Sequence, residues 1–555
     1  MKSEKSPEAE AISGYQPEIS SMLYLRTIFY LKPLQLFYNI YYRLKKPKSF
    51  SIQTPEVSGL SAKIPFPKMP QMYFGNFDFC FLNDRRKLAF PTDWNNGKIG
   101  KLWLYNLHYF DYLRQENISQ SDGEMLILQW INDNPAPVGN GWEPYPISLR
   151  IANWIKYALC GNKLPPATLN SLALQAEFLC RRTEKHLLAN HYLANAKALV
   201  FAGMFFKGKL AEKWLKKGLA IYKKELPEQI LPDGGHFERS AMYHSIILED
   251  LLDLYNISAN IELRGIIENM LKWLSKMIVP DGGIALLNDA ANGIALHYEK
   301  IFAYAKALSL EVATDSTTSA DLPQTGYARL CAGKWTLLCD GAPIGPSYQP
   351  GHAHADTLSF EMWYGDKKIF TNAGTYEYID TPIRKYQRST AAHNAVMVDE
   401  KNSSEVWKAH RVAQRANIVR REFSGNTFYA EHDGYKPRIH GRKWEVSESK
   451  VKIEDTIVGN GECRIDVFYH LASGAKVDSV ENGLLIISVG DSMFKIRYSP
   501  QYKLAVSAGK YSPEFGKLLD SQTLIFSKTA KLPSKFASEI SIISDNEDTF
   551  SKPLL

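Results

Sequence analysis

The chain has 555 residues, 45% of them hydrophobic and 23% charged, with a formal net charge of +7. This length is enough for about two to four domains, and the composition excludes a disordered or fibrous protein. The modest positive charge is compatible with an acidic partner, but zinc-finger, RNP and Lys/Arg-block signatures are absent, so we expect no nucleic acid partner. The six cysteines have no CxxC spacing and indicate neither a disulfide framework nor a cysteine metal site.

The chain begins with a polar stretch, and an apolar, aromatic segment follows it. Residues 1–21 are predicted to form a disordered tail, without the apolar stretch and cleavage site of a secretory signal. Residues 22–100 are predicted to form a helical and irregular strap, in which 22–48 are one or two helices broken at Pro33. We expect residues 22–48 to pack against the main body, with contact to a membrane surface as the alternative.

Residues 101–310 have a helical hydrophobic pattern. Apolar residues recur at three- and four-residue intervals in eight segments: 123–133, 149–159, 169–182, 191–206, 210–225, 238–257, 261–277 and 296–308. Pro-Asp-Gly-Gly turns at 232–235 and 280–283 end two of these helices and hint at a repeated hairpin unit. Many paired helices without strands predict an α/α toroid, an incomplete barrel of helical hairpins, or a solenoid.

Residues 311–325 are polar and are predicted to be a linker, after which the apolar period changes to two over 326–545. Strands are predicted at 327–340, 357–364, 394–399, 428–432, 443–457, 463–470, 484–489, 493–497 and 523–527. Many short strands joined by Gly, Asn and Asp turns indicate an antiparallel β-sandwich. The fold class predicted for the whole chain is multidomain α+β, with the helical half first.

The densest set of functional signals lies in residues 351–394 and includes three histidines. His352 and His354 are two positions apart, and we expect a strand there, which would point both rings to one face. That geometry suits a metal site, or a site in which one ring binds metal and the other contacts a substrate. The alternative is a pair of histidines at a strand edge that bind nearby backbone.

Two further signals lie in the helical half. Asn190 and His191 stand at the start of a long apolar helix, where an asparagine is an ordinary N-cap. Tyr243 lies in the opening turns of another predicted helix, five residues after Glu238, where its phenol can reach a cleft. The alternative for Tyr243 is an ordinary place in the helical core.

Together, these stretches resemble the heparinase II/III family of polysaccharide lyases. The resemblance extends over roughly residues 100–470 and is carried by five stretches in the family's order: 103–112, 190–199, 235–244, 351–356 and 388–394. It implies an N-terminal α/α toroid, a C-terminal β-sandwich and an active site in the cleft between them. The implied reaction is β-elimination of a uronic-acid-containing polysaccharide, the expected partner of this chain.

The chemistry of that reaction explains the residue types. The C5 proton of a uronate is only weakly acidic, because it lies next to a carboxylate that is already negative and must be neutralised. A base for C5–H and an acid for the departing O4 are also needed. By resemblance, Asn190 and His191 would bind the carboxylate, Tyr243 would be the acid and also a candidate base, and His352 would stabilise charge or act as the base.

The resemblance also implies contacts to the sugar. The candidates are Arg239, Tyr376, Tyr378 and Arg388, and the planar fork of an arginine matches a uronate carboxylate.

Several family members hold a structural zinc ion in the β-domain through two histidines and an aspartate. His354 and His393 match these histidines, but Asn372 stands at the aspartate position, and an amide is a weaker zinc ligand than a carboxylate. Three alternatives stay open: Asp356 substitutes, metal binds weakly, or hydrogen bonds alone hold the site. We expect a zinc ion that organises the loop and does no chemistry.

Two other classes of function stay open. A glycoside hydrolase would need two carboxylates across a cleft, such as Glu238 with Asp233, Asp281 or Asp289. A non-catalytic member would bind polysaccharide or take part in its assembly. By resemblance we expect the cell envelope or periplasm, with the cytoplasm as the alternative because no cleavable signal is recognised.

Overall fold

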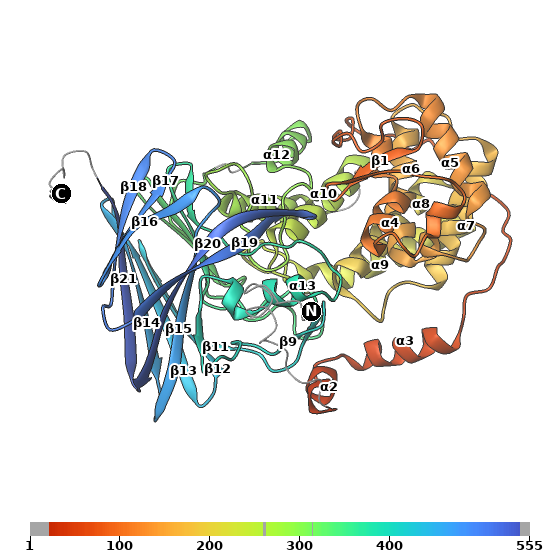
Figure 1. The fold of residues 1–555 in the computed structure, drawn as a ribbon. Coiled ribbons are helices and arrows are strands. Elements are labelled where there is room, and N and C mark those ends of the chain that lie inside the picture. Colours follow the sequence, from red (N-terminus) through yellow and green to blue (C-terminus); the bar gives the residue numbers. More distant parts are fainter. Residues whose placement is uncertain (1–20, 259–261, 313–314, 544–555) are drawn as a thin grey trace, which may run out of the picture.

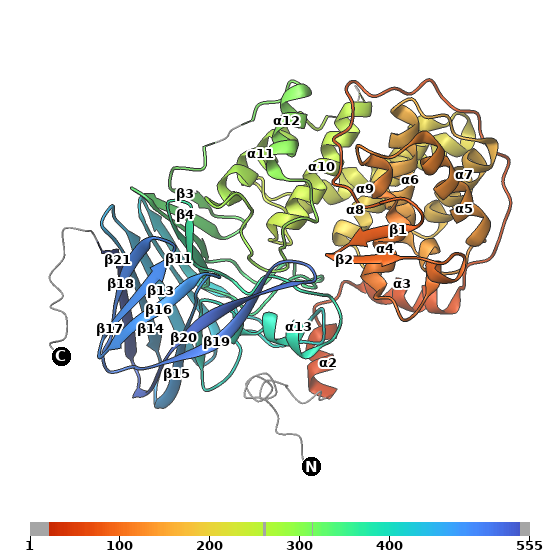
Figure 2. The same cartoon turned by 45° about the horizontal axis from the view of Figure 1, so that its top comes forward.

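The structure is a computed structural model, and it describes residues 21–258, 262–312 and 315–543. A helical half and a β-rich half lie side by side, and both views separate them clearly (Figures 1 and 2). The predicted α/α toroid followed by an antiparallel β-sandwich is confirmed. Of the predicted tail, residues 1–20 lie outside the described part. No helix among the described residues is long and apolar enough to cross a bilayer.

The chain enters through two short helices, α2 (Ser21–Ile28) and α3 (Pro33–Leu44). Pro33 occupies the first turn of α3, where a missing N–H costs nothing, so it separates the two helices. An extended strap follows and contains one hairpin, β1 (Asp78–Phe81) and β2 (Asp84–Lys87).

The helical half is built around a single hydrophobic core. Its helices are α4 (Lys101–Tyr109), α5 (Gln120–Asp133), α6 (Pro144–Leu159), α7 (Pro166–Arg181), α8 (Ala189–Phe205), α9 (Lys209–Gln229), α10 (Ala241–Ile257), α11 (Arg264–Met277) and α12 (Tyr298–Ala307). α8 and α10 are buried on nearly every face, as their almost continuous apolar sequences require. At the first Pro-Asp-Gly-Gly turn, Gly234 has φ +90° and a Cβ there would lie 2.2 Å from the carbonyl oxygen of Asn269.

The β-rich half has three main antiparallel sheets that share a second core. The five-stranded sheet is β3 (Ala320–Leu322), β4 (Tyr327–Ala332), β5 (Trp335–Asp340), β6 (Phe360–Tyr364) and β7 (Lys367–Phe370). In spatial order, the eight-stranded sheet is β11 (Ile418–Ser424), β12 (Thr427–Tyr435), β13 (Arg438–Val446), β14 (Lys450–Val458), β21 (Ser534–Ile542), β18 (Ser492–Tyr498), β17 (Leu484–Val489) and β16 (Ala475–Glu481). The four-stranded sheet is β19 (Lys503–Glu514), β20 (Lys517–Lys531), β15 (Glu462–His470) and β8 (Val396–Val398).

Several local predictions differ from the structure. The single strand predicted at 327–340 is the hairpin β4–β5, turned at Gly333 with φ +58°, because a two-residue turn does not interrupt an alternating pattern. The predicted linker 311–325 contains β3. His352 and His354 are not on a strand; they lie in the loop between β5 and β6, which faces the helical half.

Candidate active site

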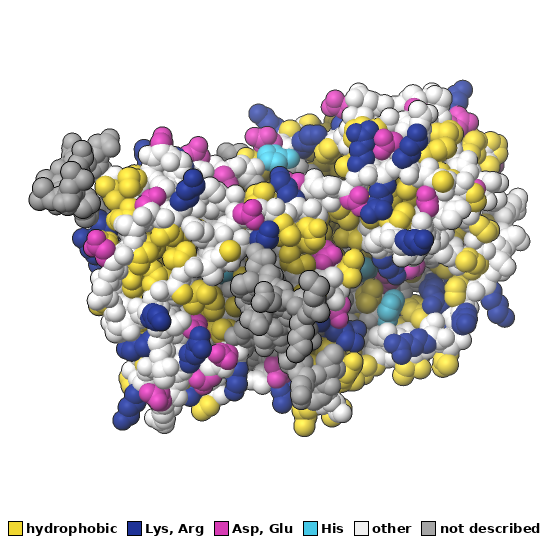
Figure 3. Space-filling model, viewed as in Figure 1, with side chains coloured by type: hydrophobic (Ala, Val, Ile, Leu, Met, Phe, Trp, Pro, Cys, Tyr) yellow, Lys and Arg dark blue, Asp and Glu magenta, His cyan; other side chains and the backbone are white. Residues whose placement is uncertain are grey.

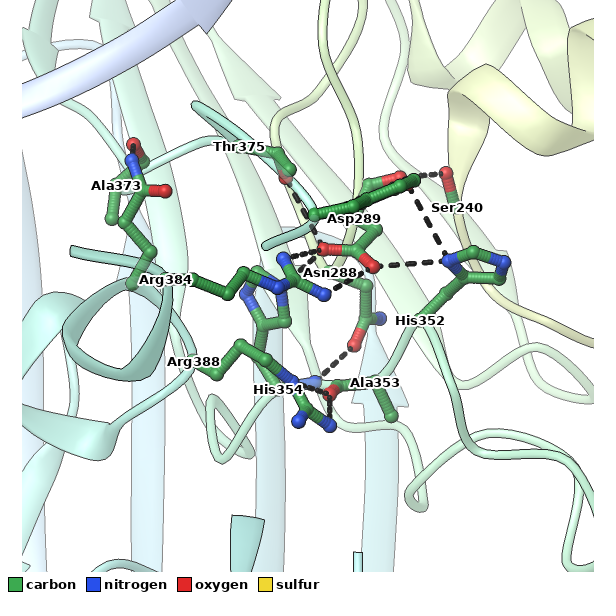
Figure 4. Close-up of polar contacts among 12 residues, drawn as sticks. Ser240, Asn288, Asp289, His352, Ala353, His354, Ala373, Thr375, Arg384 and Arg388 are labelled. Carbon is green, nitrogen blue, oxygen red and sulfur yellow. Dashed lines mark hydrogen bonds and ion pairs between the residues drawn. The ribbon is translucent and has the colours of Figure 1, made fainter. Parts of the chain in front are cut away.

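A fully buried carboxylate, that of Asp289, lies at the centre of the polar cluster between the two halves (Figure 4). Nδ1 of His352 is 3.0 Å from its Oδ2, and Nε2 of His354 is 2.8 Å from its Oδ1. The guanidinium of Arg384, from α13 (Pro382–Gln387), binds both oxygens. Burial disfavours the charged carboxylate, but the charge of Arg384 and the three hydrogen-bonded partners hold the pKa of Asp289 well below its usual range.

The loop that carries Asp289 is fixed to the start of α10. Ser240 accepts a hydrogen bond from the backbone N–H of Tyr243 as the N-cap, and its hydroxyl donates to the carbonyl of Asp289 at 2.6 Å. The side chain of the preceding residue, Asn288, accepts from the backbone N–H of His354 at 3.1 Å. The helical half therefore positions the His352 loop through both backbone and side-chain contacts.

Tyr243 is in the first turn of α10, and its ring packs on that of His352 with centroids 3.9 Å apart. Its hydroxyl is 3.1 Å from the hydroxyl of Tyr378 in the β-rich half. Burial, with the nearby Tyr378 phenol, raises the pKa of Tyr243 well above its ordinary value, so the phenol keeps its proton at neutral pH.

Asn190 lies in the first turn of α8, but it is not the N-cap; that position belongs to Leu188. Its Nδ2 is 2.9 and 3.0 Å from the two carboxylate oxygens of Glu238, and its buried Oδ1 has no hydrogen-bond partner among the described residues. Glu238 also lies 3.5 Å from Nε2 of His352. The imidazole of His352 therefore stands between two carboxylates, Glu238 and Asp289.

His191 lies beside this group and is more open, with 28% of its side chain exposed. Its Nδ1 is 3.0 Å from Glu184, and the ring of Tyr145 is 4.4 Å away between centroids. Burial disfavours the cation, but the charge of Glu184 and its hydrogen bond outweigh it and raise the pKa of His191. A partly exposed imidazolium suits a sugar carboxylate. Figure 3 shows histidine side chains in a recess of the molecular surface.

The structure gives no support to two of the predicted sugar contacts, because both guanidinium groups donate to backbone carbonyls inside the protein. Arg239 donates to Thr325 at 2.9 Å and is 9% exposed. Arg388 donates to Ala353 at 2.9 Å and is 1% exposed, and burial lowers its pKa to about 9. Both guanidinium groups hold loops together through these bonds.

Of the two tyrosines predicted to contact sugar, only Tyr378 has its hydroxyl next to His352. Tyr378 lies within the site, with its hydroxyl 3.5 Å from Nδ1 of His352. Tyr376 is half-buried and held through its backbone by Gln387 and Gly516. Asp289 and Arg384 are the site residues that sequence reasoning assigned no role in the lyase site. The sequence could have indicated Arg384, because it falls inside the stretch 351–394 that is rich in candidate site residues. Asp289 gave no such indication, because it lies 63 residues before His352.

The predicted metal ligands lie together, with one correction. The buried Nδ1 of His354 and Nε2 of His393 have no hydrogen-bond partner in the described chain. One ring nitrogen of each histidine and one carboxylate oxygen of Asp356 lie within 4.8 Å of one another. Asn372 is not the third ligand: its Oδ1 is 2.9 Å from Nδ1 of His393, on the far side of the ring. Asp356 is the carboxylate placed to complete the set, and Asn372 is positioned to orient His393, as outer partners of zinc ligands do.

This donor set fits a zinc ion. Two imidazoles and a carboxylate are ordinary zinc ligands, and two orphaned ring nitrogens that face one carboxylate are costly without a bound group. Burial lowers the pKa of both His354 and His393, which favours the neutral form that binds metal.

Known proteins resemble this chain along most of its length. The model of the heparinase II/III N-terminus matches residues 115–309, and the heparinase II/III-like C-terminal model matches 314–543. A heparin-sulfate lyase of Bacteroides stercoris is 24% identical over 416 residues, covering 67% of this chain and 60% of the relative. FtsZ-localized protein C of Caulobacter vibrioides is 24% identical over 355 residues, or 59% of each chain.

The fold has counterparts among solved structures. A crystal structure of heparinase III superposes with a TM-score of 0.67 at 17% identity, covering 82% of this chain and 79% of the other. The chain spans about 60% of the length of the Bacteroides stercoris relative. One family model matches the helical half and the other matches the β-rich half. The chain therefore belongs to the heparinase II/III family.

Proposed function

We propose that this protein is a polysaccharide lyase that cleaves a uronic-acid-containing polysaccharide by β-elimination and leaves a 4,5-unsaturated uronate end. The observation that carries the proposal is the contact between Tyr243 of the helical half and His352 of the β-rich half, with ring centroids 3.9 Å apart. The phenol of Tyr243, a proton donor, and the imidazole of His352, a proton acceptor, therefore lie beside the same position for a substrate.

Tyr243 acts as the general acid. Its raised pKa keeps the phenol protonated, and O4 of the leaving sugar needs a proton as the C4–O4 bond breaks. The hydroxyl of Tyr378, 3.1 Å away, accepts or donates a hydrogen bond as the charge on Tyr243 changes.

His352 acts as the base. Asp289 binds Nδ1 at 3.0 Å and so leaves the lone pair on Nε2, the atom that takes the C5 proton. The electron pair of the C5–H bond forms the C4–C5 double bond, and the pair of the C4–O4 bond leaves with oxygen. The imidazolium that results lies between Glu238 and Asp289, which stabilise its charge.

His191 and Asn190 bind the uronate carboxylate. His191 supplies a partly exposed imidazole whose raised pKa favours the cation, and neutralising the carboxylate makes the C5 proton more acidic. The Nδ2 atom of Asn190 contacts both carboxylate oxygens of Glu238. One of its two amide hydrogens can be shared between these oxygens, and the other hydrogen is then free to bind the substrate.

His354, Asp356 and His393 would hold a zinc ion, which would supply a fixed charge that organises the loop. The same loop carries His352, two residues before His354, so a metal bound there would help to fix the position of His352.

A glycoside hydrolase fits the geometry less well. Glu238 and Asp289 do flank a common group, but Asp289 is fully buried and both its oxygens are bound by Arg384. Asp233 accepts from the backbone of Thr325, and Asp281 accepts from Trp363 at 3.0 Å. A hydrolase needs a second carboxylate beside Glu238 that is open to water or sugar, and Asp289, the one that flanks the same group, is not open in that way.

The substrate class follows from the relatives. The Bacteroides stercoris protein is called a heparin-sulfate lyase, and we propose a glycosaminoglycan-like polymer of the heparan type, met at the cell envelope. The test is to incubate the protein with heparosan, heparan sulfate, hyaluronan, alginate and glucuronan while following the ultraviolet absorbance of the conjugated double bond. A rise on one polymer supports the lyase and names its substrate, whereas new reducing ends without absorbance would mean hydrolysis.

A further inference from the structure

We propose that α2 and α3 form a docking surface for a bilayer that contains anionic lipid. The docking surface is the set of exposed apolar side chains on these helices: Met22, Tyr24, Leu25, Ile28, Phe29, Leu34, Leu36, Phe37, Ile40 and Leu44. These are ten of the twenty large hydrophobic side chains that are exposed in the described chain, gathered within 23 residues. Such a concentration marks a binding surface, whereas single exposed apolar residues do not.

The orientation of α3 is the reverse of an ordinary surface helix, which buries its apolar stripe. The side turned to the protein carries Gln35, Tyr38 and Tyr42; Gln35 is 2% exposed, and Tyr42 donates to the carbonyl of Thr183 at 2.8 Å. On the opposite side, Leu36, Phe37, Ile40 and Leu44 recur at three- and four-residue spacing and are 38–81% exposed. Polar contacts hold the helix, and its apolar stripe is turned to the outside.

α2 repeats this arrangement on the β-rich half. Leu23 and Thr27 face inward, where Leu23 joins Trp407 in a small cluster and Trp407 donates to the Thr27 hydroxyl at 3.1 Å. Met22, Leu25 and Phe29 are exposed, with Phe29 at 86%.

The charge of this segment identifies the partner. From Ser21 to Pro55 there is no acidic residue, but there are six basic ones: Arg26, Lys32, Arg43, Lys45, Lys46 and Lys48. The last four follow directly on the apolar stripe of α3 and are all exposed. Figure 3 shows basic side chains beside hydrophobic ones along the edge where α3 lies. Apolar side chains flanked by lysines are the pattern of helices that lie in the headgroup region of anionic membranes.

The dimensions agree with a helix that lies on a bilayer. α3 has 12 residues, which is about 18 Å, shorter than the roughly 30 Å of a hydrocarbon core. The docking surface is also tied to the candidate active site, because Gln35 donates to the carbonyl of Leu187, three residues before Asn190. Docking would therefore set the orientation of the site relative to the membrane.

The test is co-sedimentation of the full chain with vesicles of phosphatidylcholine that contain about one third phosphatidylglycerol. The triple variant Phe37→Ser, Ile40→Ser, Leu44→Ser removes three of the four side chains of the α3 stripe and leaves the hydrogen bonds of Gln35 and Tyr42 in place. A matched control is Val419→Ser, Val480→Ser, Met493→Ser, whose side chains are 45–51% exposed on the β-rich half. The expected result is that the parent and the control sediment with vesicles and the stripe variant loses about tenfold or more of the binding.

A second variant, Lys45→Glu with Lys46→Glu, is expected to weaken binding to these vesicles and to abolish its dependence on salt. The proposal is overturned if the parent stays in the supernatant, or if the stripe variant binds as well as the parent. It is equally overturned if light scattering shows a parent dimer that the stripe variant turns into a monomer, because the occupant is then a second copy. Thermal melting of each variant checks that the fold is intact.

Discussion

The hydroxyl groups of Tyr243 and Tyr378 lie 3.1 Å apart, although 135 positions separate the two residues in the chain. One belongs to the helical half and the other to the β-rich half, so the contact closes the site across the domain junction. The proposed acid is therefore placed by both halves at once.

Replacement of Tyr243 by Phe is expected to lower kcat by about 10²–10⁴-fold, because the general acid loses its proton while the ring still packs on His352. The measurement is turnover by absorbance, with thermal melting to check the fold. Tyr378→Phe is the control, and its smaller loss separates the acid from its neighbour. Full activity of the Tyr243 variant would remove this residue from the mechanism.

Asp289→Asn is expected to lower activity and stability together. The change leaves the buried Arg384 without its carboxylate, a loss of about 3–5 kcal/mol in similar buried pairs. It also replaces one acceptor oxygen by an N–H donor and removes the negative charge beside His352, so the pH profile of kcat should shift as well. If only the melting temperature changes and the pH profile of the remaining activity stays the same, Asp289 supports the fold but does not position the base.

Metal analysis of the freshly purified protein is expected to find about one zinc per chain, which a chelator removes with a fall in melting temperature. Asp356→Asn and His393→Ala should both lose the metal. Asn372→Ala should weaken metal binding by about 10–100-fold without abolishing it, since the residue acts through His393. Metal retained by the Asp356 variant would contradict the ligand set.

Buried histidines are expected to make the protein sensitive to acid. Burial lowers the pKa of His108 and His244 from 6.5 to about 3. The unfolded chain takes up these protons near pH 6.5 and the folded chain does not, so stability is complete above that pH and falls as the pH drops towards 3. Each histidine contributes a slope of about 1.4 kcal/mol per pH unit. Urea unfolding between these pH values measures it, and His244→Asn should reduce the slope by about one proton.

His191→Ala is expected to raise KM while the melting temperature changes little, because the ring is partly exposed and faces the site. Arg388→Ala is expected to lower the melting temperature while KM changes little, because the buried guanidinium holds the carbonyls of Ala353 and Lys408. Steady-state kinetics and melting of the two variants distinguish a residue that binds substrate from one that holds a loop. Equal losses of stability in both would argue against the carboxylate role of His191.

Much of the fold follows from local patterns in the sequence. Apolar residues at three- and four-residue spacing placed α5 to α12 within a few residues of their observed ends, because a helix must bury a stripe. The hairpins were harder: β13 and β14 were predicted as one strand, 443–457, since the short turn at 447–449 does not break the alternation.

The sequence by itself determined the helical half, the β-rich half and the residue types of the site, from Asn190 and Tyr243 to the histidines at 352, 354 and 393. The tertiary structure decided which of these residues meet. Asp289 binds Arg384 across 95 positions, Asp356 lies beside His354 and His393, and two expected sugar-binding arginines are buried on carbonyls. The physical reason is that periodicity reports which face of an element is buried, whereas a long-range polar contact depends on how loops from separate domains pack together.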